Sequence, residues 1–437
     1  MRNLFDSIRT YYPATLRSSP KKANYRRFKH LSLLDLGADS LKAIVAQREN
    51  GAVRILGYGI ASVHACALDG DRTSILTLAV AADEALTTAE DRTASDVAHK
   101  VVPDDAVFCL PARFIRSRLV TLHQRRLDPA APVSAREVAR LRERVEKLLH
   151  EQLIDHHNQN ETWKPLASAT SLMLAIDGHP VSDAIGLKGK MLSASIFGFA
   201  APSRIVDVVA TIAKRLEVSV YAVVAGPQSL ATLVPQRDAI LLDVGGQGTN
   251  LNLIRHNALV ATVWWPQGGE LFTSSLAQKF RCIPERAEAL KRAYVDNTLS
   301  REDVFLVKRA LEKPLSSWFE SFVSALRNLT AEHHNSRSAR PESDASLAYT
   351  TGNDEGILPG RVFVTGGGSL LPDLMSTASS VATVPGLHFD RAVEVQSLGS
   401  CLSSCRSGQS SFLLNVPPRP MGDLLASAIG SAASVVW

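Results

Sequence analysis

The chain has 437 residues, 45% of them apolar and 21% charged, so it can bury a large core and form two or more domains. No uncharged apolar run reaches the roughly 20 residues that span a bilayer. The five cysteines show neither metal-ligand spacing nor a disulfide framework, which favours reduced thiols in a cytoplasmic protein. The net charge of +5 is concentrated in residues 1–30, which excludes a generally basic, nucleic-acid-binding body.

The first 30 residues form a basic tail. Leu4, Phe5 and Ile8 fall on one face of a short helix, with Arg9 beside them. Such a helix suits the interface of an anionic membrane, and we predict that these four residues make the contact. A disordered tail, a helix packed on a partner, an organellar transit peptide and a nucleic-acid arm remain as alternatives.

Residues 31–102 alternate strands and helices. The first strand ends in Asp35-Leu36-Gly37, and a second alternating run begins at Ser40 and contains Lys42. This pattern predicts a strand, a tight turn and a strand. A glycine lets backbone N–H groups approach a phosphate, small hydroxyls add donors, and an aspartate can hold Mg²⁺ through water.

Residues 103–201 break the alternating pattern. A strand ending near Leu110 is followed by a long amphipathic helix that opens on the capping box Ser134-Ala135-Arg136-Glu137. Further strands are predicted at 171–176 and 192–198. We expect a small α+β insertion here, with residues 202–235 returning to the first lobe.

A second Asp-x-Gly turn follows at Asp243, with Gly245, Gly246 and Thr249 in the turn and a strand on either side. A single turn of this kind is an ordinary hairpin in most proteins. Two of them, in two related halves, could hold one polyphosphate from opposite sides. We assign residues 236–437 to this second lobe.

Two further features of the second lobe bear on function. Glu288, Lys291 and Arg292 share one face of a predicted helix, a spacing that most often means only a helix ion pair. The glycine turn Gly366, Gly367 and Gly368 follows a buried type of strand. Between them, residues 331–360 lack periodicity and are predicted to form a mobile loop.

Taken together, residues 31–436 resemble the actin-like ATPase superfamily, and within it the bacterial FtsA-like cell-division proteins of the FtsA/PilM group. The stretch from Gly178 to Lys190 is similar to an FtsA segment ending in Pro-x-Gly-x-x-Gly, and Ala287-Glu288-x-x-Lys291 to that family's helix motif. The resemblance implies an α/β, actin-like (ribonuclease H-like) two-lobed fold with a small α+β SHS2-type insertion domain.

The resemblance also implies a site for ATP and Mg²⁺. Asp35 and Asp243 would lie near the metal and the phosphates, holding Mg²⁺ through water. The α-helical trio would face the nucleoside, and the third glycine turn would pass beside the adenine. The full set of expected cofactor-binding residues is Asp35, Gly37, Ser40, Lys42, Asp243, Gly245, Gly246, Thr249, Glu288, Lys291, Arg292, Gly366, Gly367 and Gly368.

Three departures from the family pattern concern catalysis. The family usually has Thr or Ser where this chain has Ala38, and a Glu-Pro pair where it has Gly226-Pro227. The second turn usually reads Asp-x-Gly-Gly-Gly-Thr-Thr-Asp, whereas here the sixth and eighth places are Gly248 and Asn250. We therefore expect ATP binding with slow or absent hydrolysis, and assign no catalytic residue.

Family likeness suggests three roles. An FtsA-like protein would form filaments, tether the tubulin-like division protein FtsZ and lie on the inner face of the cell membrane. A PilM-like protein would instead be a scaffold of type IV pilus assembly. A sugar kinase of the same superfamily is disfavoured by the missing carboxylates, and no nucleic-acid partner is expected.

Overall fold

A computed structural model describes residues 29–49, 52–63, 68, 72–97, 99–154, 161–167, 172–338, 356–404, 413–418 and 420–436. The predicted membrane residues Leu4, Phe5, Ile8 and Arg9 lie outside these ranges. Among the described helices, none is long and apolar enough to cross a membrane.

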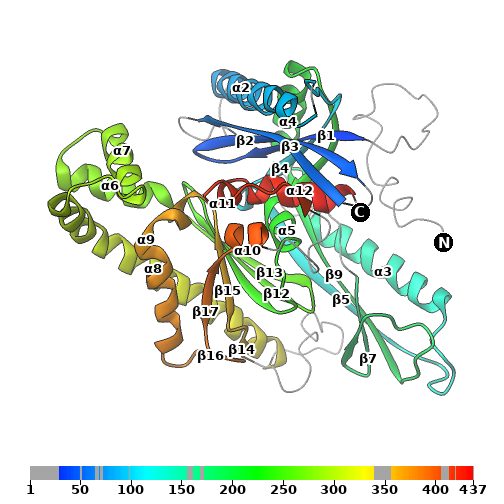
Figure 1. Ribbon diagram of the computed structural model, residues 1–437. Coiled ribbons are helices and arrows are strands. Elements are labelled where there is room, and N and C mark those ends of the chain that lie inside the picture. Colours follow the sequence, from blue (N-terminus) through cyan, green and yellow to red (C-terminus); the bar gives the residue numbers. More distant parts are fainter. Residues whose placement is uncertain are drawn as a thin grey trace.

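The first lobe is built on a six-stranded sheet of order β10-β4-β1-β2-β3-β18. Strands β1, β2 and β3 form an antiparallel meander, and β4 and β10 continue the sheet in parallel with β1. Helices α2 and α4 cover one face (Figure 1). The bounds are β1 His30–Leu36, β2 Ser40–Glu49, β3 Ala52–Ser62, α2 Arg72–Val97, β4 Asp105–Leu110, α4 Ser203–Arg215, β10 Ser219–Ala225 and β18 Leu413–Leu414.

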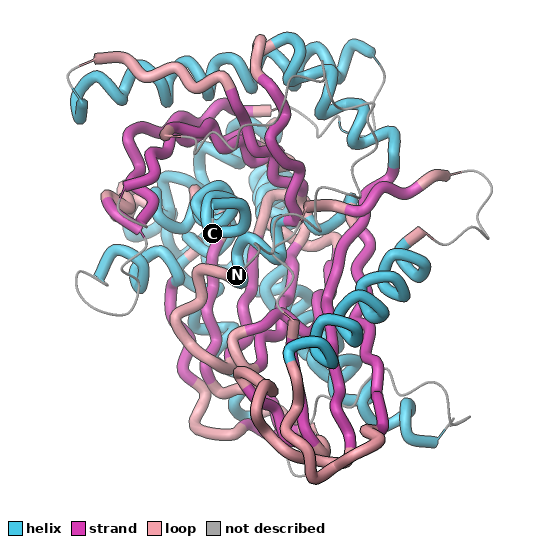
Figure 2. The backbone as a smooth tube through the Cα atoms, turned by 90° about the vertical axis from the view of Figure 1, so that its right-hand side faces the viewer, coloured by secondary structure: helices cyan, strands magenta, loops and turns pink. Residues whose placement is uncertain are grey.

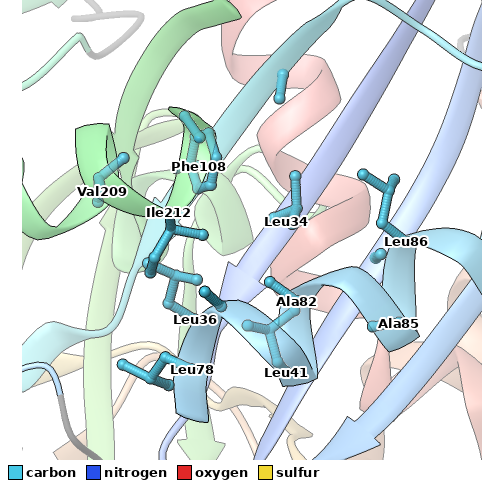
Figure 3. Close-up of a cluster of buried hydrophobic side chains, with 14 of the residues drawn as sticks. Leu34, Leu36, Leu41, Leu78, Ala82, Ala85, Leu86, Phe108, Val209 and Ile212 are labelled. Atoms are coloured by element: carbon cyan, nitrogen blue, oxygen red, sulfur yellow. The ribbon is translucent and has the colours of Figure 1, made fainter. Parts of the chain in front are cut away.

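Alternation along β1 decides which residue faces which layer. Leu34 and Leu36 pack in the buried cluster beneath α2 and α4 (Figure 3), whereas Leu33 belongs to a different cluster on the opposite face. Because successive side chains of a strand point to opposite faces, Asp35 shares the face of Leu33. That face looks toward the middle of the molecule.

The second lobe repeats the same plan. Its five-stranded sheet has the order β13-β12-β11-β15-β17, with an antiparallel meander followed by two parallel strands. Leu242 and Val244 pack with residues of α6 and α8, so Leu241 and Asp243 face the other way. The bounds are β11 Ala239–Val244, β12 Thr249–Arg255, β13 Ala258–Trp265, α6 Gly269–Phe280, α7 Pro284–Val295, α8 Arg301–Ser338, β15 Arg361–Thr365, α9 Pro372–Ser379 and β17 Glu394–Ser397.

Helices α5 (Gly226–Ala231) and α12 (Ala426–Val436) form a layer between the two sheets (Figure 1). They cross closely at Gly430, where an added Cβ would lie 2.1 Å from the Ser229 carbonyl oxygen. The predicted second lobe, 236–437, therefore contains a final stretch that packs on the first sheet, since β18 pairs with β3 and α12 contacts β1, β2 and β4.

The insertion is a sheet of order β5-β9-β7-β8, with β6 paired to β9 and α3 packed against it (Figure 2). The predicted capping box is confirmed: Ser134 Oγ accepts from the Glu137 amide at 3.2 Å, and Glu137 Oε2 accepts from the Ser134 amide at 2.8 Å. The bounds are β5 Arg116–Arg125, α3 Ala135–Leu153, β6 Trp163–Pro165, β7 Met173–Ile176, β8 His179–Val181 and β9 Met191–Pro202.

The predicted loop 331–360 was wrong at both ends. Helix α8 continues to Ser338, because its apolar stripe from Val307 to Leu329 packs against the second sheet and supports the polar turns beyond it. A short strand returns at 357–358, and residues 339–355 lie outside the described ranges. The remaining short elements are η4 Ala112–Phe114, β14 Ile357–Leu358, η5 Gly367–Leu370, η6 Ser380–Thr383, β16 His388–Phe389, α10 Leu398–Ser404 and α11 Met421–Leu424.

Candidate functional site

The two Asp-x-Gly hairpins meet where the inner faces of the two sheets converge. Asp35 and Asp243 each lie near the end of a central strand. Because successive side chains of a strand point to opposite faces, both are on the inner face of their sheet and point toward this place. Burial, and then the charge of Asp35, raise the pKa of Asp243 to about 6, while Lys42 opposes the shift. Asp35 and Asp243, from different lobes, therefore interact electrostatically where the two hairpins meet, and we call this largely buried junction the cleft.

The hairpin register places Lys42 beside Asp35. Lys42 stands directly opposite Asp35 across β1 and β2, and its Nζ donates to Asp35 Oδ2 at 3.0 Å. Burial favours neutral Lys42, but the charges of Asp35, Asp243 and Asp39 outweigh it and raise the pKa of the ammonium. Gly37 leaves room for this group, since an added Cβ would lie 2.7 Å from Lys42 Nζ.

The second hairpin is bound to the start of α6. The Gly245 amide donates to the Gly248 carbonyl at 2.9 Å, which closes the turn. The amides of Gly269 and Glu270 donate to the carbonyls of Gly245 and Gly246, each at 2.8 Å. These bonds hold the turn rigidly at the cleft.

The Thr249 hydroxyl does not join the cleft. Thr249 pairs with Val244 across β11 and β12, so it shares the core face of Val244 rather than the face of Asp243. Its hydroxyl donates to the Gln267 carbonyl at 2.6 Å and accepts from Trp318 Nε1 at 2.9 Å. The structure therefore places it in the core of the second lobe, away from Ser40 and Lys42, which lie on the cleft hairpin.

The α7 residues form a compact charged group beside the second hairpin. Lys291 Nζ lies 2.6 Å from Glu288 Oε2 and donates to Thr273 Oγ1 at 2.8 Å and to the Gly269 carbonyl at 3.1 Å. Burial would raise the pKa of Glu288, but Lys291 and the hydrogen bonds from Thr273 and Arg292 prevail, and the pKa is lowered. Arg292 is largely exposed at the edge of the group.

The third glycine turn is pressed against the end of β11. Gly366 has φ +85, and an added Cβ would lie 2.5 Å from the Val244 carbonyl oxygen and 2.6 Å from Asp243 Oδ1. A Cβ on Gly368 would lie 2.5 Å from Val244 Cγ1. Only glycine fits both the left-handed backbone and the space at Gly366. The turn therefore meets the Asp243 hairpin directly.

Sequence reasoning missed two polar residues near the C-terminus. Ser427 on α12 donates to Asp35 Oδ2 at 2.6 Å. Asp423, 1% exposed, accepts from Ser397 Oγ and the Gly399 amide, each at 2.7 Å, and its carbonyl accepts from Thr365 Oγ1 at 3.1 Å. Polar residues within an otherwise apolar terminal segment were the available clue to both.

The side chains gathered at this junction have the chemistry that a nucleotide with its metal would need. Lys42 and Lys291 supply cationic donors, and Asp35 and Asp243 offer carboxylate oxygens beside the three glycine turns. Within the described residues, no three His, Cys, Asp or Glu side chains gather as a metal site. A hard cation here would thus take most of its ligands from water and phosphate oxygens, as Mg²⁺ commonly does.

No protein-family profile matches the sequence, and no curated protein matches it significantly. Among solved structures, the chain is similar to one chain of the PilM–PilN type IV pilus biogenesis complex. The identity is 18% and the TM-score 0.54, and the match covers 93% of this chain and 98% of that one.

Weaker likenesses link the chain to two further structures. One is the ethanolamine utilization protein EutJ from Carboxydothermus hydrogenoformans, with 15% identity, a TM-score of 0.45, and coverage of 95% of this chain and 91% of that one. The other is component A of (R)-2-hydroxyglutaryl-CoA dehydratase from Acidaminococcus fermentans, with 10% identity, a TM-score of 0.36, and coverage of 93% and 96%. The PilM–PilN likeness confirms the predicted actin-like two-lobed α/β fold.

Proposed function

We propose that this protein binds an adenine nucleotide with Mg²⁺ and acts as an assembly scaffold rather than as a rapidly turning-over enzyme. One observation carries the nucleotide proposal: Lys42 donates to Asp35 at 3.0 Å, and the charge of Asp243, on the hairpin of the other sheet, also raises the pKa of Lys42. Glu288, Lys291 and Arg292 would face the nucleoside, and the turn Gly366–Gly368 would lie beside the base. The bound metal would neutralise phosphate charge, while Lys42 would bind and orient the phosphates.

Slow chemistry follows from what surrounds the two acids. Asn250 shares the face of Asp243, but its amide is bound to Asn252 and Thr262, at 2.8 and 2.9 Å, and carries no charge. Gly226, at the start of α5, offers no side chain to activate a water. General-base catalysis needs a positioned basic group, and neither residue supplies one.

We place this scaffold in one of two membrane-bound assemblies. The first is a PilM-like role in type IV pilus assembly, which is supported by a likeness over nearly the whole length of both chains. The second is an FtsA-like role that recruits FtsZ at cell division. It is supported by the Gly178–Lys190 stretch and by the motif ending at Lys291.

In either role, we propose that residues 1–12 bind the cytoplasmic face of the membrane and that self-association multiplies a weak contact. We also propose that residues 103–201 are an SHS2-type domain, set between residues 31–102 and 202–235 of the first lobe. Binding of the nucleotide between the lobes would then set the orientation of the surface that contacts the partner protein.

Calorimetric titration of the full chain with Mg-ATP tests the nucleotide proposal. Wild-type protein should bind ATP, and Lys42→Ala should weaken binding about tenfold or more, because a cationic donor to phosphate is lost. Lys188→Ala, at an exposed position of the insertion, is the control and should bind normally. Absence of binding by folded wild-type protein at millimolar ATP would refute the proposal.

Co-sedimentation with anionic liposomes tests the scaffold. Pelleting in Mg-ATP should be lost in a chain that begins at Lys29. Co-purification of a PilN-type protein would select the pilus role, and co-purification of FtsZ the division role. Pelleting that does not depend on residues 1–28 would contradict the membrane contact.

A further inference from the structure

Asp39 occupies the tip of the first hairpin and reaches across to the second. Its carbonyl accepts from the Val63 amide at 2.9 Å, which fixes the backbone of the tip. A Cβ added to Gly246 would lie 1.8 Å from Asp39 Oδ2 and 2.5 Å from Oδ1. The carboxylate therefore lies directly on Gly246, in the space between the two hairpins.

Charged groups from both lobes influence this carboxylate. Lys42 acts on it from the first hairpin and Lys291 from α7, while Glu270 and Glu288 oppose them. Burial is the largest influence and raises the pKa of Asp39. A position against a glycine turn and under the influence of two lysines has the chemistry of an anion site.

A second contact joins the same corner of the second hairpin to the first lobe. Arg113, in the turn after β4, donates to the side-chain oxygen of Gln247. Gly246 thus lies against Asp39 of the first lobe and Gln247 is bonded to Arg113 of that lobe, so the hairpins are closed on one another in this structure.

We propose that Asp39 is a built-in anion that occupies the place of a nucleotide phosphate and weakens the binding of phosphates in this cleft. This inference rests on the proposed nucleotide function, and in it Asp39 is the residue that lowers the affinity of the site for phosphates. Phosphates entering between the hairpins meet a fixed negative charge, which Mg²⁺ offsets. Asp39 should therefore lower the affinity most for metal-free ATP and should not change the affinity for adenosine, which has no phosphate.

The test compares wild-type protein with Asp39→Asn and Asp39→Ser, in binding titrations with adenosine, ADP and ATP, each with and without Mg²⁺. Both variants should bind metal-free ATP about tenfold tighter or more, with a smaller gain for Mg-ATP and none for adenosine. Asp83→Ser, on the exposed face of α2, removes the same charge and should leave all affinities unchanged. Circular dichroism verifies that each variant is folded.

Three results would overturn the proposal. Binding of ATP that is measurable but unchanged in both Asp39 variants removes this role and leaves the proposed function intact. Weaker Mg-ATP binding in both variants would make Asp39 a group that helps to hold the metal. If wild type, Asp39→Asn and Asp39→Ser are all folded and bind neither adenosine nor ATP, the proposed function fails as well.

Discussion

Ser427 donates a hydrogen bond of 2.6 Å to Asp35 Oδ2, the same oxygen that accepts from Lys42 at 3.0 Å, although Ser427 and Asp35 are 392 residues apart. The bond joins α12, in the layer between the sheets, to the first hairpin of the cleft. Asp423, on the preceding turn, joins the same segment to the third glycine turn through Thr365. The C-terminal segment thus contacts both sides of the cleft.

Replacing Ser427 by Ala should cost about 1.5–3 kcal/mol of unfolding free energy, because it removes a hydrogen bond to a buried carboxylate. Ser431→Ala is a matched control on the same helix, since that hydroxyl donates to a backbone carbonyl, that of Ala428, at 2.6 Å. Urea unfolding measures both variants. Equal losses would show that the Asp35 contact adds nothing beyond the burial of a serine.

Asp243 should make stability depend on pH. Its pKa is raised from 3.8 to about 6, so the folded state holds the proton more tightly than the unfolded state does. The free energy of unfolding therefore falls as pH rises from about 4 to about 6, and the full loss is present above pH 6. Asp243→Asn, which carries no charge, should be stabilised by about 2–3 kcal/mol at pH 7.5 and by about half as much at pH 5.

Chemical unfolding at the two pH values, without metal or nucleotide, measures this difference. Asp83→Asn, on the exposed face of α2, loses the same charge and serves as the control. A gain for Asp243→Asn that stays the same at both pH values would contradict the assigned cause.

Gly366 should tolerate no side chain. In Gly366→Ala, the left-handed φ strains the backbone and the new Cβ clashes with Val244 and Asp243. In Gly386→Ala, only the φ of +81 causes strain, because the space around the residue is open. The Gly386 variant should lose about 1–2 kcal/mol from backbone strain. The Gly366 variant should lose about 1–3 kcal/mol more, as overpacked cores do. Similar losses in the two variants would show that the turn can move away from β11.

The sequence allowed the fold to be predicted because strand alternation and Asp-x-Gly turns are local. Alternation along β1 and β11 brings Asp35 and Asp243 to facing surfaces, and the hairpin register adds Lys42. The same register rule explains Thr249, whose partner Val244 points into the core. Counting residues across that turn could have placed its hydroxyl correctly.

The missed residues all depend on contacts between distant segments. Ser427 reaches Asp35 only because α12 returns between the sheets, and Asp39 reaches Gly246 only because the lobes close on each other. No local pattern encodes either distance. The length of α8 was missed for a related reason, since its polar end is supported by packing of the preceding turns.

The final prediction concerns turnover. Protein kinases typically transfer phosphate at about 1–100 per second, through positioned acids, bases and metal ions. Here Asp35 is bound by Lys42 and Ser427, and Asn250 is a neutral amide held in a network with Thr262. Because the remaining carboxylate, Asp243, is assigned to the metal, no carboxylate is left at these places to activate water, and single-turnover hydrolysis of bound ATP should fall below about 0.01 per second. Lys42→Ala sets the background from contaminating enzymes, and a wild-type rate in the kinase range above that background would show that another group activates the water.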